Sequence, residues 1–171
     1  MPAATQHRFV DMRIADVLKV PAPPGCYIVL LEERDGQRQL LIWIAGAEAT
    51  SMALRLAGMG LPARPLGWDL TAALVAALGG RLVEVRVDRL DESTFYATVV
   101  VDGPQGPAEV DARPSDALNL ALVVGVPVRV DGDVLDRAIA EEPDVPVPPL
   151  PAPGGQGAPG ARAIVEELFA G

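Results

Sequence analysis

Four polar side chains gather in the segment DARPSDALNL, residues 111–120. Asp111, Arg113, Ser115 and Asp116 come directly before a run of apolar residues. Part of this pattern is typical of a helix start, where proline fits the first turn and a carboxylate accepts from free backbone N–H groups. Arg113 is not explained in this way, because a guanidinium is unfavourable at the positive end of a helix dipole unless an anion lies beside it. That anion is either the carboxylate of Asp111 or Asp116, in an ordinary ion pair, or a bound phosphate.

Other chemical motifs are absent from the sequence. The only histidine, His7, is close to the N-terminus, and we do not expect it to serve as a general base in a catalytic triad. No zinc-ligand spacing, glycine-rich phosphate loop or dinucleotide fingerprint occurs. Any chemistry is therefore expected to depend on carboxylates, arginine and serine.

Composition limits the class of protein. The 171 residues suffice for one domain with a core, and 50% of them are hydrophobic. The formal net charge of −9 argues against a broad surface for duplex nucleic acid, but it leaves room for a small arginine-lined cleft or a carboxylate metal site. No signal peptide is recognisable, and no apolar run reaches the roughly 20 residues of a membrane helix. We expect a cytoplasmic protein without membrane contact.

The sequence contains two similar halves. Residues 40–57 align with residues 108–125 without a gap, so that Glu48 falls on Asp116. Weaker matches before and after this block follow the same order in both halves. We infer an internal duplication, with copies at about 8–79 and 81–140.

Each copy predicts the same order of elements. Alternating apolar and polar residues predict a half-buried strand, and a second strand, an Asp-Gly turn and a third strand follow. Two helices complete the unit, which is therefore β-β-β-α-α. The predicted fold class is α+β, a mostly antiparallel sheet with helices packed on it. The third strands are predicted at 39–44 and 107–112, and the helices at 47–57, 69–78, 115–124 and 133–141.

The C-terminal region differs from the duplicated domain of residues 1–142. Residues 143–160 are rich in proline and glycine and predict an extended linker. Residues 161–171 contain a short amphipathic helix at 161–169. It either docks on its own domain or a sister subunit, or it frays. Its apolar side is predicted to hold Ile164, Val165, Leu168 and Phe169.

Acidic residues begin all four predicted helices of the two copies. One explanation is that they stabilise the helix starts, which is a common use of such residues. The other is that pseudo-symmetry brings some of them together as oxygen ligands for Mg²⁺ or Mn²⁺. These residues are Glu48, Asp69, Asp116 and Asp133.

The motif VDARPSDALNLAL (110–122), followed by GVPVRVDGDVLDRA (125–138), resembles the signature of the bifunctional nuclease domain family. GAEATSMAL, RPLGWDL and DESTFYATVVV fit the same family in the same order, so the resemblance covers about residues 8–142. It implies a duplicated α+β fold that associates as homodimers or larger homo-oligomers. It also implies an RNase and DNase activity, which has been assigned to plant members.

The family pattern also implies a set of site residues, with one departure in this chain. The family has a His-Asp pair where this sequence has Trp68-Asp69, and a tryptophan cannot transfer a proton at neutral pH. The chain keeps the remaining residues of the pattern, which are Glu48, Asp69, Asp111, Arg113, Ser115 and Asp116.

The first hypothesis for function is a nuclease that hydrolyses phosphodiester bonds in RNA or single-stranded DNA. Glu48, Asp69 and Asp116 are expected to hold one Mg²⁺ or Mn²⁺ ion that activates water. Arg113 is expected to bind the scissile phosphate, and Ser115 to orient it. Arg64 and Asp111 are further candidates for substrate contacts.

The second hypothesis is a non-catalytic, oligomeric ligand-binding or assembly module that has lost the family histidine at Trp68. Arg113 and Asp116 then form an ion pair that holds the two halves, or two subunits, together. The two hypotheses predict different effects of divalent ions on the melting temperature, since only a metal site is stabilised by its ion.

Overall fold

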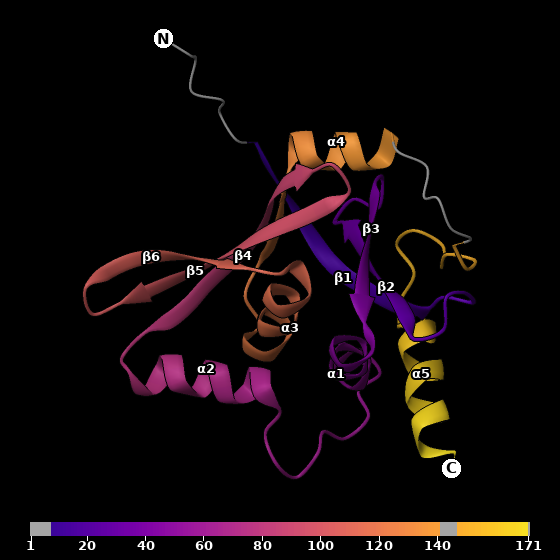
Figure 1. The fold of residues 1–171 in the computed structure, drawn as a ribbon, viewed down its shortest axis with the longest axis horizontal. Helices are drawn as coiled ribbons and strands as arrows, with labels where there is room; N and C mark the ends of the chain where they lie inside the picture. Colours follow the sequence, from indigo (N-terminus) through magenta and orange to yellow (C-terminus); the bar gives the residue numbers. More distant parts are fainter. Residues whose placement is uncertain (1–7, 141–146, 171) are drawn as a thin grey trace.

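A computed structural model describes residues 8–140 and 147–170 of the chain (Figure 1). His7 and the first part of the predicted linker lie outside the described residues. The strands are β1 (Phe9–Lys19), β2 (Cys26–Glu33), β3 (Gln39–Ala45), β4 (Arg81–Asp91), β5 (Thr94–Gly103), β6 (Gly106–Ala112) and β7 (Val128–Asp131). The helices are α1 (Gly46–Leu56), α2 (Gly67–Ala77), α3 (Pro114–Val124), α4 (Gly132–Ala140) and α5 (Pro159–Phe169).

The strands form one seven-stranded sheet in the order β3-β2-β1-β7-β4-β5-β6. Two antiparallel meanders, β1–β2–β3 and β4–β5–β6, make up its two sides. The short strand β7 joins them, because it pairs antiparallel with β1 and parallel with β4. This confirms the predicted α+β class and the mostly antiparallel sheet.

The element order β-β-β-α occurs in both halves, as predicted, but the second half departs from the expected unit. β7 lies between α3 and α4, where the β-β-β-α-α unit has no strand. Val128 and Val130 of β7 are buried at the centre of the sheet, so this strand is selected by tertiary pairing with β1 and β4. Four residues are too few to show a strand periodicity in the sequence. The duplication itself stays a prediction.

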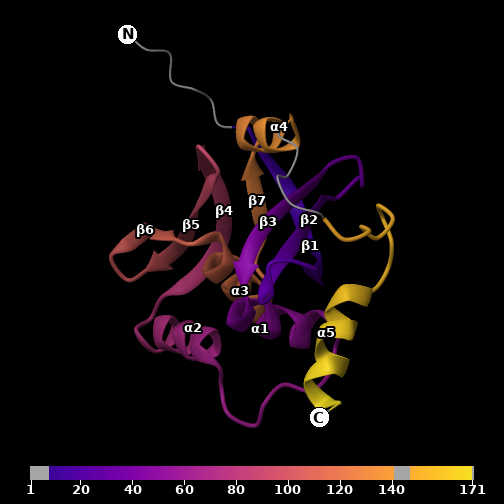
Figure 2. The same cartoon turned by 45° about the vertical axis from the view of Figure 1, so that its right-hand side comes forward.

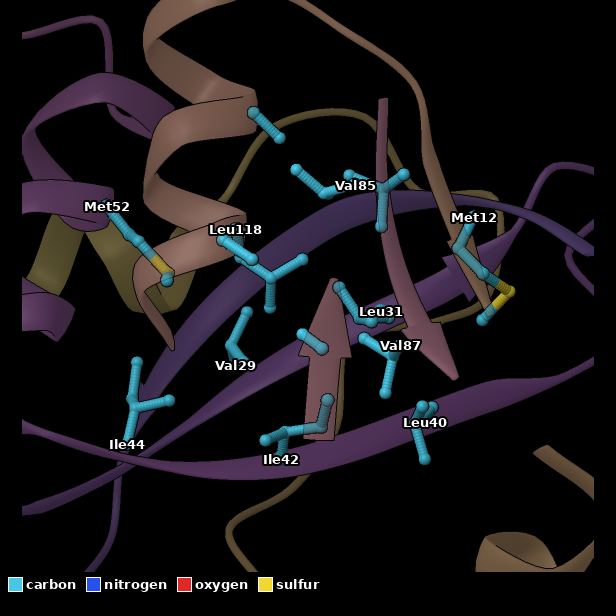
Figure 3. Close-up of a cluster of buried hydrophobic side chains, with 14 of the residues drawn as sticks. Met12, Val29, Leu31, Leu40, Ile42, Ile44, Met52, Val85, Val87 and Leu118 are labelled. Carbon is cyan, nitrogen blue, oxygen red and sulfur yellow. The ribbon is translucent and has the colours of Figure 1, made fainter. Parts of the chain in front are cut away.

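The core lies between the two meanders and the helices α1 and α3 (Figure 3). Alternate residues of the strands point into it, which is the period of two expected for half-buried strands. Met52 of α1 and Leu118 of α3 are fully buried against these strand residues. This packing fixes α1 and α3 beside each other, and with them the two segments that carry the candidate site. The strand residues shown include Val29, Leu31, Ile42, Ile44, Val85 and Val87.

α4 lies at one end of the sheet, whereas α1, α2 and α5 lie at the other (Figures 1 and 2). None of the helices in the described residues has the length and apolar character that crossing a membrane requires. The cytoplasmic location stays a prediction.

The C-terminal helix α5 docks on its own domain, where it contacts α1 and β1. Ala161, Ile164 and Val165 are buried in this contact. The last two residues of the predicted apolar side, Leu168 and Phe169, remain exposed, because the helix extends past the body of the domain.

A buried carboxylate holds the start of α5. Asp16 of β1 is completely buried, and it accepts hydrogen bonds of 2.8 Å from the backbone N–H groups of Val17, Gly160 and Ala161. The N-cap residue of α5, Ala158, has no side chain that could accept from these groups. A carboxylate at the positive end of the helix dipole is favourable, so β1 supplies the cap that the helix itself lacks.

The approach of α5 to β1 also requires glycine. A Cβ atom at Gly160 would lie 2.5 Å from both Leu18 Cδ2 and the carbonyl oxygen of Val17. Glycine at position 160 therefore permits the contact that brings Asp16 to the start of α5.

We expect Asp16→Asn to lower the free energy of unfolding by roughly 2 kcal/mol, because the amide has one acceptor oxygen where the carboxylate uses two. Chemical denaturation measures the change. Glu167→Gln is the matched control on the same helix, since the pair that Glu167 forms with Lys19 is exposed and should contribute little. Equal stability of the wild-type protein and Asp16→Asn would contradict this role of Asp16.

Candidate functional site

The starts of α1 and α3 meet at one cleft. The N-cap residues are Ala45 and Arg113, and neither side chain caps its helix. Both residues line a cleft of about 470 Å³, together with Glu48 of α1 and Ser115 of α3. The positive ends of two helix dipoles therefore border the same region, which favours a negatively charged group there.

Arg113 joins the two halves at this cleft. Its Nε donates to Asp116 Oδ2 at 2.7 Å, and its Nη2 donates to Asp116 Oδ1 at 3.1 Å and to Glu48 Oε1 at 2.9 Å. Of the partners that the sequence left open for Arg113, which were Asp111, Asp116 and a bound phosphate, Asp116 forms the ion pair in the structure. Glu48 is a second anion that the sequence did not assign to Arg113. The hydrogen bonds and charge of Asp116, with a smaller contribution from Glu48, raise the pKa of Arg113 and keep it cationic.

Burial is unequal in this ion pair. The side chain of Arg113 is 66% exposed, whereas that of Glu48 is only 9% exposed. The carboxylate of Glu48 is therefore the partner that depends on the contact, because an unpaired buried charge is costly. No described residue accepts a hydrogen bond from Arg113 Nη1, which leaves this nitrogen for a ligand.

Trp68 contacts the site directly. Its indole Nε1 donates to Asp116 Oδ1 at 3.1 Å, so Trp68 holds the same carboxylate that pairs with Arg113. The indole N–H is a donor only, and it can orient Asp116 but cannot exchange a proton with it.

Asp69 has other partners. Arg55 Nη2 donates to both of its oxygens, at 2.8 and 2.9 Å, and the backbone N–H of Leu66 donates to Oδ2 at 2.9 Å. Asp69 thus caps the start of α2 and holds the side chain of Arg55 beside it.

The expected metal site has no direct support from this geometry. In residues 8–140 and 147–170, no group of three or more His, Cys, Asp or Glu side chains is arranged to hold a metal ion. Each carboxylate of the predicted ligand set Glu48, Asp69 and Asp116 has an arginine partner. Asp133 begins α4, which lies at the opposite end of the sheet from α1. Metal binding by the first three stays a prediction.

The remaining candidates divide between the cleft and the open surface. Ser115 is buried at the wall of the cleft. Arg64, in the loop between α1 and α2, and Asp111, on β6, are exposed and do not contribute to the cleft lining.

A buried polar contact sets the spacing of the two helices. Asn119 Nδ2 donates to the carbonyl oxygens of Glu48, at 3.2 Å, and of Ser115, at 3.0 Å. Asn119 therefore ties the start of α1 to the start of α3 and positions the residues on both sides of the cleft. Neither its role nor that of Trp68 was assigned from the sequence.

The opposite wall of the cleft was also missed. It consists of β3 and the turn that leads into β5, with Ile42, Trp43, Ile44 and Phe95 among its residues. No local pattern in the sequence relates these segments, since they meet only when the sheet is formed.

A family model for the bifunctional nuclease domain matches residues 29–143, and the chain belongs to this family. Two similar proteins come from Mycobacterium tuberculosis, one from strain CDC 1551 / Oshkosh and one from strain ATCC 25618 / H37Rv. Each is 44% identical over 134 residues, which are 78% of this chain and 79% of the relative. Both relatives are described as uncharacterized proteins, so their names assign no activity.

We expect Arg113→Ala to lower the free energy of unfolding by about 1 kcal/mol, a modest loss because the guanidinium is largely exposed. In a Glu48→Gln background the loss should be smaller, since the carboxylate that needs Arg113 is then neutral. A double-mutant cycle by chemical denaturation measures this coupling. Arg81→Ala is the control, because Arg81 forms a fully exposed pair with Asp102. Additive effects of the two site variants would contradict the coupling.

Proposed function

We propose that the protein is a nuclease that hydrolyses phosphodiester bonds in RNA or single-stranded DNA at the cleft between the starts of α1 and α3. Family membership supports the class of reaction. The observation that carries the proposal is the position of Arg113, which stands exposed between two uncapped helix starts with Nη1 open to a ligand.

Phosphate binding needs little change at this site. A phosphodiester oxygen can accept from Arg113 Nη1 while Nε keeps its bond to Asp116. Backbone N–H groups at the two helix starts add partial positive charge, and the hydroxyl of Ser115 lies at the wall of the cleft. A fixed guanidinium beside the phosphorus stabilises the negative charge that grows on the phosphate oxygens during attack.

Hydrolysis also requires a proton acceptor. Water attacks phosphorus, its oxygen forms the new P–O bond, the bond to the leaving oxygen breaks, and the leaving oxygen takes a proton from solvent. Glu48 lines the cleft, Asp116 does not, and both carboxylates are bonded to Arg113; one of them accepts the proton of the attacking water. Asp69 does not contact the substrate. It holds Arg55 and the start of α2, and so it positions Trp68, which lies on that helix.

Binding of Mg²⁺ or Mn²⁺ at this site would use the carboxylates of Glu48, Asp69 and Asp116. The geometry does not favour it, since at least one arginine has to release its carboxylate first. None of the steps above depends on a metal ion.

Cleavage of labelled single-stranded RNA and DNA, in Mg²⁺, Mn²⁺ or EDTA, tests the proposal. We expect Arg113→Ala to reduce the rate by a factor of about 100, the usual effect of removing one transition-state donor, and Asp116→Asn to reduce it as well. Arg162→Ala, an exposed arginine on α5, should not change the rate. Trp68→His should raise the rate, because it places a group with a pKa near neutrality beside Asp116.

Two results would contradict the proposal. One is a rate that is the same in the wild-type protein, Arg113→Ala and Asp116→Asn, which indicates a contaminating nuclease. The other is the absence of cleavage in the wild-type protein and in Trp68→His under all three ionic conditions.

The second candidate function, a non-catalytic assembly module, is favoured by α2. This helix has no buried residue, and its outer side is formed by exposed apolar side chains that include Leu70, Leu74 and Leu78. Residues 70–80 contain no charged side chain. A helix that is apolar on its outer face is normally covered, and a face without charge is compatible with a second copy of itself. We infer a homodimer or larger homo-oligomer through α2.

Sedimentation velocity tests this assembly. We expect the wild-type protein to sediment as a dimer or larger species and Leu74→Glu to sediment as a monomer, because a charge cannot be buried in the apolar contact without a partner. Leu168→Glu is the matched control on another helix, as Leu168 is exposed to a similar degree. A monomeric wild-type protein at tens of micromolar would contradict the assembly through α2.

A further inference from the structure

We propose that the cleft beside Arg113 holds one unstacked nucleobase, so that the protein recognises a nucleotide unit in a single strand and not only its phosphate. This inference rests on the proposed function, because it takes the phosphate of that unit to lie at Arg113. It adds a base subsite made by β3 and the start of β5, to which none of the residues of the segment 111–116 contributes.

The walls of the cleft suit a flat, largely apolar group. Ile42 and Ile44 of β3 form one part of it, and Phe95 of β5 forms another. Ile42 and Ile44 belong to the core, so this part of the cleft is rigid and apolar. Phe95 offers an aromatic surface, and every nucleobase has a π-face that can stack on one.

Trp43 stands at the rim. It lies between Ile42 and Ile44 on β3, so its side chain points to the other face of the strand, and it is 38% exposed. A large aromatic side chain that remains exposed next to a cleft is available for stacking on a base that enters or leaves it.

The free edge of β3 supplies polar groups. β3 is an edge strand of the sheet, and within the described residues it pairs only with β2. Backbone N–H and C=O groups on its open side are therefore available along the part of the strand that lines the cleft. The hydrogen-bonding edge of a base needs such partners once the base has left its own pairing partner.

Size and charge agree with a nucleotide. A volume of about 470 Å³ falls within the range of small-molecule sites, roughly 300–1,000 Å³. The guanidinium of Arg113 and the helix starts lie at one side of the cleft, and the apolar walls lie at the other. A ligand that fits both parts carries an anionic group next to a flat apolar group.

The same geometry selects against duplexes. A base enters the cleft only after it has left the stack, and a paired and stacked base has to be extruded first, which costs free energy. The net charge of −9 offers no broad basic surface to compensate for that cost.

Calorimetric titration in EDTA tests the base subsite. The two probes are a single-stranded tetramer of deoxythymidine and the same tetramer with abasic sites in place of the bases. We expect the tetramer with bases to bind roughly five- to a hundredfold more tightly, the usual effect of stacking one base on an aromatic side chain. Phe95→Leu, which removes the aromatic surface of the cleft and keeps an apolar side chain there, should remove most of this ratio and leave the affinity for the abasic tetramer unchanged.

Two further variants complete the test. Phe169→Ala is the matched control, because Phe169 is an exposed aromatic residue on α5, outside the cleft. It should keep the ratio of the wild-type protein. Arg113→Ala should weaken the binding of both probes by the same factor, since both carry the phosphates that Arg113 binds.

Each outcome separates the base subsite from the proposed function. Equal affinity for both probes, with a loss in Arg113→Ala, would overturn the base subsite and keep Arg113 as the phosphate contact. A ratio that Phe95→Leu preserves would place the base elsewhere and overturn this assignment. No binding of either probe would overturn the nucleic-acid site altogether. A Phe95-dependent ratio without any cleavage would support the base subsite and argue against hydrolysis.

Discussion

The bridge from Arg113 to Glu48 and Asp116 is the interaction on which the site depends. It links two helix starts that are 65 residues apart in sequence, and it neutralises a carboxylate that the core has removed from water. Without it, the start of α1 would carry an unpaired buried charge next to the positive start of α3. The contact is therefore both structural and positioned for chemistry, because the guanidinium keeps one nitrogen free while the other two are engaged.

The contacts of Arg113 are compatible with both interpretations of residues 111–116, the structural ion pair and the phosphate site. Asp116 receives hydrogen bonds from Arg113 and from Trp68, so its orientation is fixed by a cation on one side and by a neutral donor on the other. In a protein with histidine in place of Trp68, that second donor could also take up and release a proton. In this chain the carboxylate of Asp116 and the guanidinium of Arg113 lie beside an indole N–H, which does not exchange a proton at neutral pH.

The parts of the fold that the sequence predicted are those set by local patterns. Both third strands and all the helices show a period or an end signal in their own residues, and Gly125 ends α3 in the left-handed conformation that favours glycine. The strand β7 was not predicted, because four residues become a strand only through their pairing with β1 and β4. The sequence called for an anion beside Arg113 and left Asp111, Asp116 and a phosphate as alternatives, because the contact between Arg113 and Asp116 is local. The contact to Glu48, the indole of Trp68 and the wall from β3 were missed, since each depends on segments that meet only in the folded chain.

The cap that Asp16 provides for α5 has a consequence for the order in which the fold can be completed. The partners Asp16 and Gly160 are 144 residues apart, and the carboxylate lies on the first strand. During synthesis on the ribosome, β1 emerges long before α5, whose backbone N–H groups donate hydrogen bonds to Asp16. The meanders can pair in that interval, but the buried position of Asp16 becomes favourable only once α5 has been released. The stability that this cap contributes is therefore gained only after α5 has been synthesised, late in translation of the described residues.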